Sequence, residues 1–136
     1  AWLSTLPEDV ALQIVARQGF GRPEDYGPNA PTTVKTLVDI LHEARRRGYA
    51  MINEMFAPGM TAMAAPVQRE GEAAIGVITV AGPLVRLTED RMRTLAPELI
   101  AVARELAMAS GASPIFIRHA SPAQTAKGRM AAATSG

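Results

Sequence analysis

MTAMAAPVQREGEAAIGVITVAGP, residues 60–83, is the stretch that decides the fold. Two apolar runs flank a short polar segment, residues 69–72, which holds Gly71 where a tight hairpin turn requires a positive φ. The second run, residues 75–81, is rich in β-branched residues and carries no charge, which is typical of a strand buried on both faces. The stretch therefore predicts an antiparallel β-hairpin around which the rest of the chain packs.

A two-residue turn at Glu70 and Gly71 would fix the register of this hairpin. The predicted pairs are Ala62 with Thr79, Ala64 with Val77, Val67 with Ala74, and Arg69 with Glu72. Because successive side chains of a strand point to opposite faces, the register also assigns every residue of the hairpin to one of two faces.

The two faces differ in character. One is apolar throughout and suits helix packing; it carries Met63, Ala65, Val67, Ala74, Gly76, Ile78 and Val80. The other has small residues around a single hydroxyl; it carries Ala62, Ala64, Pro66, Ile75, Val77, Thr79 and Ala81. Small residues leave room, and a few polar groups in an apolar hollow are typical of a small-ligand site. The alternative interpretation is a second packed core in which Thr79 bonds to the backbone.

Length and composition limit the class of protein. The chain has 136 residues, enough for one domain, and 48% of them are hydrophobic. No uninterrupted apolar run reaches the roughly 18 to 20 residues that a membrane span requires. The net charge of +1 is too small to indicate nucleic acid or an anionic membrane as the main partner of these residues. The chain has no cysteine, which excludes disulfides and fits a reducing cytoplasm.

Three helices are predicted around the hairpin. They are expected over residues 1–18, from Thr32 or Thr33 to Arg47, and from Thr88 to Gly111. The first is indicated most strongly from Pro7, and Pro97 should kink the third. The buried stripe of the third helix is predicted to be Met92, Leu95, Leu99, Val102 and Leu106.

The remaining segments are a strand and two irregular stretches. Residues 49–55 are predicted to form a strand, and residues 20–31, rich in proline and glycine, a loop. That loop is either a surface connector or a lid over a pocket. A short strand is expected at Ile115–Arg118, within a C-terminal extension, residues 112–136, that is expected to be largely flexible.

Catalytic and metal-binding patterns are sparse. His42 and His119 are the only histidines, and neither has metal-ligand spacing. The sequence has neither a Gly-x-Ser-x-Gly elbow nor a phosphate-binding Gly-Lys-Ser loop. We therefore expect no metal, no cofactor and no enzymatic activity. An enzyme of unrecognised type would need a base near Thr79, for which only Glu54 or His42 is available.

An ordered set of motifs resembles a known family. The motifs are Arg47-Gly48-Tyr49-Ala50, Gly59, Ala64-Ala65-Pro66-Val67, Val77-Ile78-Thr79-Val80-Ala81-Gly82-Pro83 and Arg86-Leu87-Thr88. This order resembles the effector-binding domain of IclR-type bacterial transcriptional regulators over roughly residues 1–111. The resemblance implies an α+β fold, with helices packed on an antiparallel sheet in a GAF-like or profilin-like sensor domain. It also implies a small organic effector and assembly into dimers or tetramers.

The resemblance also implies an incomplete domain. The family's early strands and a glycine-rich turn would precede Ala1, as would the winged helix-turn-helix that binds DNA. We therefore expect residues 1–111 to be an effector-binding domain that is truncated at its N-terminus. In this interpretation the effector shifts the arrangement of subunits, and DNA binds only through the missing domain.

Candidate ligand contacts follow from matched positions. Thr79 and Ala81 match contacts on the family's central strand, and Ala62 matches one on the preceding strand. An acidic contact of some members matches Ile52, whose neighbours Asn53 and Glu54 become candidates instead. Met60 is a candidate for the wall of the cavity. The predicted ligand-binding set is therefore Thr79, Ala81, Ala62, Asn53, Glu54 and Met60.

These departures from the family pattern indicate a less polar pocket that takes an aromatic or carboxylic acid. Two other functions stay open. One is a structural oligomerisation domain without ligand, and the other is an unrecognised enzyme that acts on a small molecule.

Overall fold

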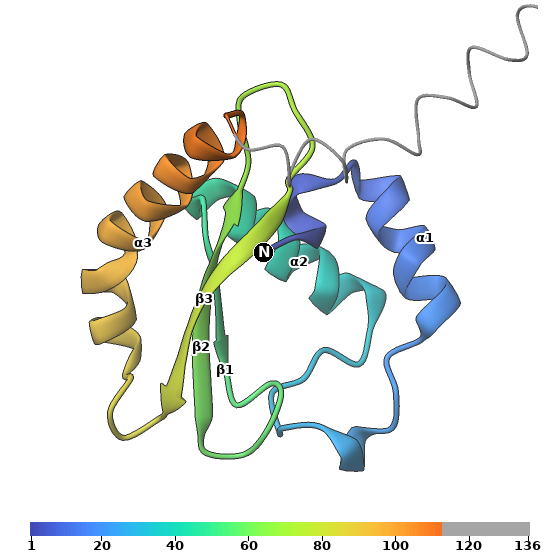
Figure 1. Ribbon diagram of the computed structural model, residues 1–136. Coiled ribbons are helices and arrows are strands. Elements are labelled where there is room, and N and C mark those ends of the chain that lie inside the picture. The colour runs from blue at the N-terminus through green and yellow to red at the C-terminus, as the bar shows by residue number, and fades with distance from the viewer. Residues whose placement is uncertain (113–136) are drawn as a thin grey trace, which may run out of the picture.

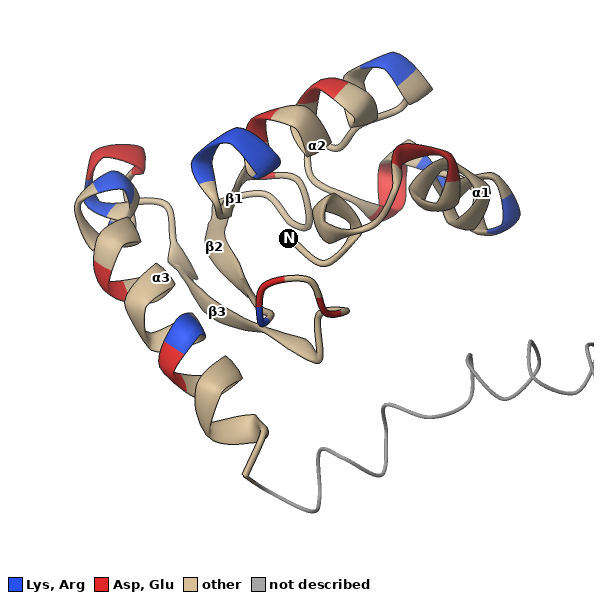
Figure 2. Cartoon of the chain, turned by 90° about the horizontal axis from the view of Figure 1, so that it is seen from above, with Lys and Arg blue, Asp and Glu red and all other residues tan. Residues whose placement is uncertain are grey.

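The computed structural model describes residues 1–112, which form a three-stranded antiparallel sheet with helices on both sides (Figure 1). The elements are, in chain order, η1 (Leu3–Thr5), α1 (Glu8–Gln18), η2 (Pro23–Asp25), α2 (Val34–Arg47), β1 (Ala50–Asn53), β2 (Met60–Val67), β3 (Gly76–Pro83) and α3 (Glu89–Ser110). The strands follow the order β1-β2-β3. Helix α3 covers one face of the sheet, whereas α1 and α2 lie on the other side (Figure 2). The α+β prediction is thus confirmed, and the predictions for residues 113–136 lie outside the described residues.

The hairpin turn forms as predicted. The backbone N–H of Glu72 donates to the carbonyl of Arg69 at 3.1 Å, and Gly71 between them has a φ of +75°. The side chains of Arg69 and Glu72 also form an ion pair at 2.7 Å. Glu70 and Gly71 are therefore the central residues of a tight turn.

The predicted register of the two strands is wrong by two residues. Ala62 pairs with Ala81 rather than with Thr79, and Ala64 pairs with Thr79. The shift arises because strand pairing does not resume directly after the turn: the N–H of Ile75 bonds to the carbonyl of Val67, and regular pairing begins only at Gly76. Since side chains alternate with a period of two, this slip leaves every paired residue of β2 and β3 on its predicted face, whereas Ala74 and Ile75 precede β3 and are not paired.

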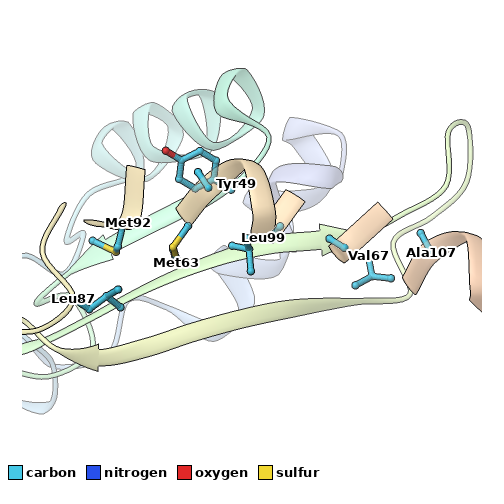
Figure 3. Close-up of a cluster of buried hydrophobic side chains, with 10 residues drawn as sticks. Tyr49, Met63, Val67, Leu87, Met92, Leu99 and Ala107 are labelled. Carbon is cyan, nitrogen blue, oxygen red and sulfur yellow. The ribbon is translucent and has the colours of Figure 1, made fainter. Parts of the chain in front are cut away.

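The apolar face of the hairpin packs against α3, as expected (Figure 3). Met63, Ala65 and Val67 of β2 are buried there. The helix residues in this core are Met92, Ala96, Leu99, Ala103 and Ala107. Alanines at three of these five positions let the helix lie close to β2.

The predicted stripe of α3 is therefore only partly correct. Met92 and Leu99 are buried, but Val102 and Leu106 are 38% and 46% exposed. The hydrophobic pattern predicted that the larger side chains face the sheet. In the structure the helix lies close to β2, and the row of alanines faces the sheet instead. Two aliphatic side chains consequently remain on the outer side of the helix.

The first helix begins later than predicted. Residues 3–5 form a single 3₁₀ turn, and Leu6 is extended, with a φ of −88° and a ψ of 155°. Leu6 precedes Pro7, and a residue before proline is driven out of the helical region by steric clash. Helix α1 therefore starts at Glu8 and ends before Gly19, the predicted stop.

The predicted caps of the other helices are confirmed, but the first strand is shorter than expected. The side-chain oxygen of Thr33 accepts from the N–H of Thr36 at 3.2 Å, and that of Thr88 accepts from the N–H of Arg91 at 3.3 Å.

Strand β1 ends at Asn53, because Glu54 turns the chain with a φ of +50°.

Helices α1 and α2 form a second small core with the N-terminal turn. Ala11, Leu37 and Leu41 are buried in it. Arg45 of α2 ties the N-terminal segment down by donating to the carbonyls of Ser4 and Leu6, at 2.8 and 2.7 Å. In Figure 2, α2 lies beside β1, and α1 lies farther from the sheet. Among residues 1–112, the helices are too short or too polar for one to traverse a lipid bilayer.

Candidate functional site

The face of the sheet opposite α3 carries the residues that the sequence singled out. Ala62 pairs with Ala81, and Ala64 pairs with Thr79, so these four side chains share one face. The two alanines of β2 are half-buried, whereas Thr79 and Ala81 of the edge strand β3 are exposed. We call Ala62, Ala64, Thr79 and Ala81 the open sheet face, because two of the four residues are exposed and the other two are only half-buried.

The other predicted contacts lie in different places. Met60 shares the side of the open sheet face and is 39% exposed. Asn53 pairs with Thr61 and so belongs to the opposite face, toward α3. The carboxylate of Glu54 accepts from the N–H of Gly59 at 2.8 Å, within the connection between β1 and β2. The structure therefore groups Met60, but not Asn53 or Glu54, with Thr79.

A hollow of about 290 Å³ adjoins the open sheet face at the end of β1. Ile52 lies in its wall and pairs with Ala62, which joins the hollow to that face. Its principal lining residues are Phe20, Tyr26, Leu37, Ile52, Met55 and Phe56. All ten residues that line it are uncharged. We call this cavity the aromatic hollow.

Sequence reasoning missed the three aromatic residues of this hollow. Phe20 and Tyr26 come from the loop of residues 20–31, and Phe56 from the connection between β1 and β2. The only signal was the length of the loop, for which a lid was one of two interpretations. No local pattern in the sequence links that loop to residues 53–56.

Backbone hydrogen bonds hold the loop against the β1–β2 connection. The N–H of Gly27 donates to the carbonyl of Met55 at 3.1 Å, and the N–H of Asn29 donates to that of Glu54 at 3.2 Å. The side-chain amide of Asn29 donates to the carbonyl of Asn53 at 3.0 Å. These bonds join two segments that are more than 20 residues apart, and they fix the wall of the aromatic hollow.

Two glycines make this arrangement sterically feasible. A Cβ atom at Gly27 would lie 1.9 Å from the carbonyl oxygen of Glu54, so only glycine fits there. A Cβ atom at Gly21 would lie 2.5 Å from Cε2 of Tyr26, and Gly21 has a φ of +72°. The loop thus uses glycine both to approach the β1–β2 connection and to seat the Tyr26 ring.

A second hollow, of about 500 Å³, lies toward the other end of the same side of the sheet. Arg45, Pro66 and Gln68 are among its lining residues. The guanidinium of Arg45 already donates to two backbone carbonyls, so it is engaged in holding the N-terminal turn. Thr79 lines neither hollow; the strand register places it between them, on the open sheet face.

The titratable groups considered for catalysis are engaged elsewhere. Nε2 of His42 lies 2.6 Å from Oε2 of Glu8 and connects α2 to α1. The carboxylate of Glu54 bonds to the backbone of Gly59. Among residues 1–112, no three histidine, aspartate or glutamate side chains come together in a way that could hold a metal ion. His119 lies outside the described residues.

Comparison with known proteins matches this fold and sequence to one family. Residues 3–108 match the family described as "Bacterial transcriptional regulator IclR C-terminal". The chain is 43% identical over 86 residues to the regulator BhcR of Paracoccus denitrificans, covering 62% of this chain and 30% of that protein. It is 28% identical to the Escherichia coli transcriptional repressor IclR over 82% of this chain and 39% of that protein. The chain therefore spans less than half of these relatives, which are regulators of transcription.

A solved structure gives the same fold. The inducer-binding domain of a double mutant of the PobR transcription factor from Acinetobacter, in complex with 3-hydroxybenzoic acid, superposes with a TM-score of 0.68. The match has 24% sequence identity and covers 77% of this chain and 61% of that domain. Since the family model covers most of the chain, the chain belongs to the IclR family of bacterial transcriptional regulators, and it corresponds to their C-terminal domain.

Proposed function

We propose that this chain is the small-molecule sensing domain of a transcriptional regulator and binds an organic effector on the open sheet face. The observation that carries the proposal is the uncovered row of small residues around Thr79, with the aromatic hollow at its end. Family membership supports a regulatory role rather than an enzymatic one. The aromatic acid bound to the PobR domain supports an aromatic or carboxylic acid as the class of effector.

The residues suggest how recognition works. Ala62 and Ala81 leave room for a flat molecule, and the Thr79 hydroxyl supplies one hydrogen-bond donor and acceptor. Met60 adds an adaptable apolar wall. Covering about 100 Å² of apolar surface contributes about 2.5 kcal/mol at the usual value per unit area. Apolar burial and one or two hydrogen bonds therefore account for a modest affinity, as suits an effector that must also dissociate.

Thr79→Val tests the role of the hydroxyl, since valine has nearly the same shape. Losing one hydrogen bond of about 1 kcal/mol should weaken effector binding about fivefold. The measurement is a thermal-shift screen of small aromatic and carboxylic acids against the wild type and the variant. Thr94→Val, which removes an exposed hydroxyl on α3, is the matched control. Ligand stabilisation that is equal in all three proteins would remove Thr79 from the site.

DNA binding and coupling belong to the longer protein in this proposal. The run of basic residues Arg45–Arg47 at the end of α2 is engaged within the domain: Arg46 and Arg47 pair with Glu43, and Arg45 bonds to backbone carbonyls. The net charge of the chain is +1. The effector would act by changing how subunits are arranged, and the DNA-reading part would respond to that change. Assembly into dimers or tetramers is therefore part of the proposed function, as is a cytoplasmic location.

The outer side of α3 is the surface that we propose for self-association. Val102 and Leu106, one turn apart on the same side of the helix, are 38% and 46% exposed. Leu106→Asp should shift the chain from dimer to monomer in size-exclusion chromatography with light scattering. Ala101→Asp adds the same charge to a different side of the helix and should leave the dimer intact. A wild-type chain that is monomeric at high micromolar concentration would contradict this surface.

A further inference from the structure

We infer that the aromatic hollow binds an uncharged aromatic ring, which is the apolar end of the effector. This inference rests on the proposed sensing function, and it adds where the ring lies and which part of the ligand is excluded from the hollow. It is carried by the chemistry of the lining residues, by the absence of charge and by the fixed shape of the wall.

Aromatic residues are concentrated at this cavity. Residues 1–112 contain five aromatic residues, and three of them, Phe20, Tyr26 and Phe56, line the hollow. Phe56 is 71% exposed and Tyr26 is 41% exposed, so neither ring is needed to fill the core. Aromatic rings prefer offset or edge-to-face contact with another ring. An aromatic ligand would cover surface that the fold itself leaves in water.

The charge of the lining excludes an ionised group. None of the ten lining residues is charged, so a carboxylate in the hollow would lose its hydration without gaining a counter-ion. The hydroxyl of Tyr26 makes no hydrogen bond to another residue within 1–112 and can bond to a neutral polar substituent. The hollow therefore favours a phenol-like ring, and the acid group of an effector must lie outside it.

The hollow is preformed and fits one ring. Its volume of about 290 Å³ is near the lower end of the roughly 300–1,000 Å³ typical of ligand pockets. The hydrogen bonds of Gly27 and Asn29 to the β1–β2 connection hold its wall. Glu54, with a φ of +50°, and its bond to Gly59 hold the connection itself. A ligand therefore meets a site that needs little ordering.

The position of Ile52 sets the direction of the ligand. Ile52 lies in the wall of the hollow and pairs with Ala62, which in turn pairs with Ala81. A substituent on a bound ring can therefore extend from Ile52 onto the open sheet face toward Thr79. The ring and the polar group of one effector would thus occupy two adjoining parts of the same side of the sheet.

Calorimetric titration of the 136-residue chain with phenol and with cyclohexanol tests the inference. Both probes are uncharged and carry one six-membered ring and one hydroxyl, but only phenol is aromatic. We expect phenol to bind about fivefold more tightly than cyclohexanol. Phe56→Ala should weaken phenol binding at least fivefold, because it removes one aromatic wall. Val85→Ala truncates another apolar side chain, 85% exposed and outside the hollow, and should change binding less than twofold.

Several results would overturn the inference. Cyclohexanol that binds as tightly as phenol would mean that the hollow selects apolar volume and not an aromatic ring. Phenol binding that is unchanged in Phe56→Ala would place the ring elsewhere. If phenol does not bind but acids still stabilise the chain in a Thr79-dependent way, the hollow fails and the proposed function stands. If phenol binds with Phe56 dependence but no acid depends on Thr79, the hollow stands and the Thr79 site fails.

Discussion

Gly27→Ala is expected to lower the free energy of unfolding by about 3 kcal/mol, combining overpacking with the loss of one or two hydrogen bonds. The new Cβ atom would lie 1.9 Å from the carbonyl oxygen of Glu54, which is backbone and cannot rotate away. The loop must then move, and the bonds from Gly27 to Met55 and from Asn29 to Glu54 are lost with it. For a domain of this size the melting temperature should fall by about 10 °C. Circular dichroism during thermal and urea unfolding measures both quantities.

Gly76→Ala is the matched control for this substitution. A Cβ atom at Gly76 meets no other atom within 4 Å, so the same methyl group should change stability by less than about 1 kcal/mol. The Gly27 variant should also lose phenol binding at temperatures where it is still folded, because the wall of the aromatic hollow moves. Equal melting temperatures for the two variants would mean that the loop does not pack on Glu54.

Met92→Ala is expected to lower the free energy of unfolding by about 3 to 4 kcal/mol. The side chain is fully buried, with 0% exposure, between α3 and β2, where Met63 is also buried (Figure 3). Truncation removes apolar contacts and leaves a cavity that the β-sheet cannot close. Urea unfolding followed by circular dichroism gives the difference in free energy.

Two further variants separate burial from chemistry at this position. Met92→Leu keeps most of the volume and should cost less than about 1.5 kcal/mol. Met108→Ala removes the same atoms from a side chain that is 76% exposed, and it should lower the free energy of unfolding by less than about 0.5 kcal/mol. A Met92→Ala variant as stable as Met108→Ala would contradict the packing of α3 on β2.

The hairpin shows what short-range patterns can predict. Gly71 indicates a tight turn, and the two apolar runs beside it indicate strands, so both were predictable from residues 60–83. The expectation that the second strand is buried on both faces is wrong, because β3 is an edge strand in which Thr79, Val80 and Ala81 are exposed. The register was not, because it depends on how many residues are left unpaired between the turn and the first regular pair. The error did not reach the candidate site, since a slip of two residues keeps Ala62 and Thr79 on one side of the sheet.

Helix α3 shows where hydrophobic periodicity is insufficient. Its predicted stripe included Val102 and Leu106, but the side that meets β2 carries Ala96, Ala103 and Ala107. Hydrophobicity ranks valine and leucine above alanine, whereas close packing on a sheet favours the smaller side chain. The identity of the facing strand decides between the two rows, and that information is not local to the helix.

The aromatic hollow could not be predicted from the sequence. It exists because the loop of residues 20–31 is bonded to residues 53–55 across more than 20 residues of chain. Asn53 and Glu54 were predicted as ligand contacts from their place next to Ile52. In the structure, Asn53 lies on the other side of the sheet, and the Glu54 carboxylate accepts a hydrogen bond from the N–H of Gly59.

Mapping of backbone amide shifts in a ¹H–¹⁵N spectrum, during titration with 3-hydroxybenzoic acid and related small acids, tests the sensing assignment most directly. The account predicts concentration-dependent shifts at Ile52, Ala62, Thr79 and Ala81 and in residues 19–31. The amide shifts of the α3 residues that pack on β2, such as Ala96 and Ala103, should not change. Shifts confined to α3, or none at millimolar concentrations of every acid tested, would contradict the assignment of a sensing site to this side of the sheet.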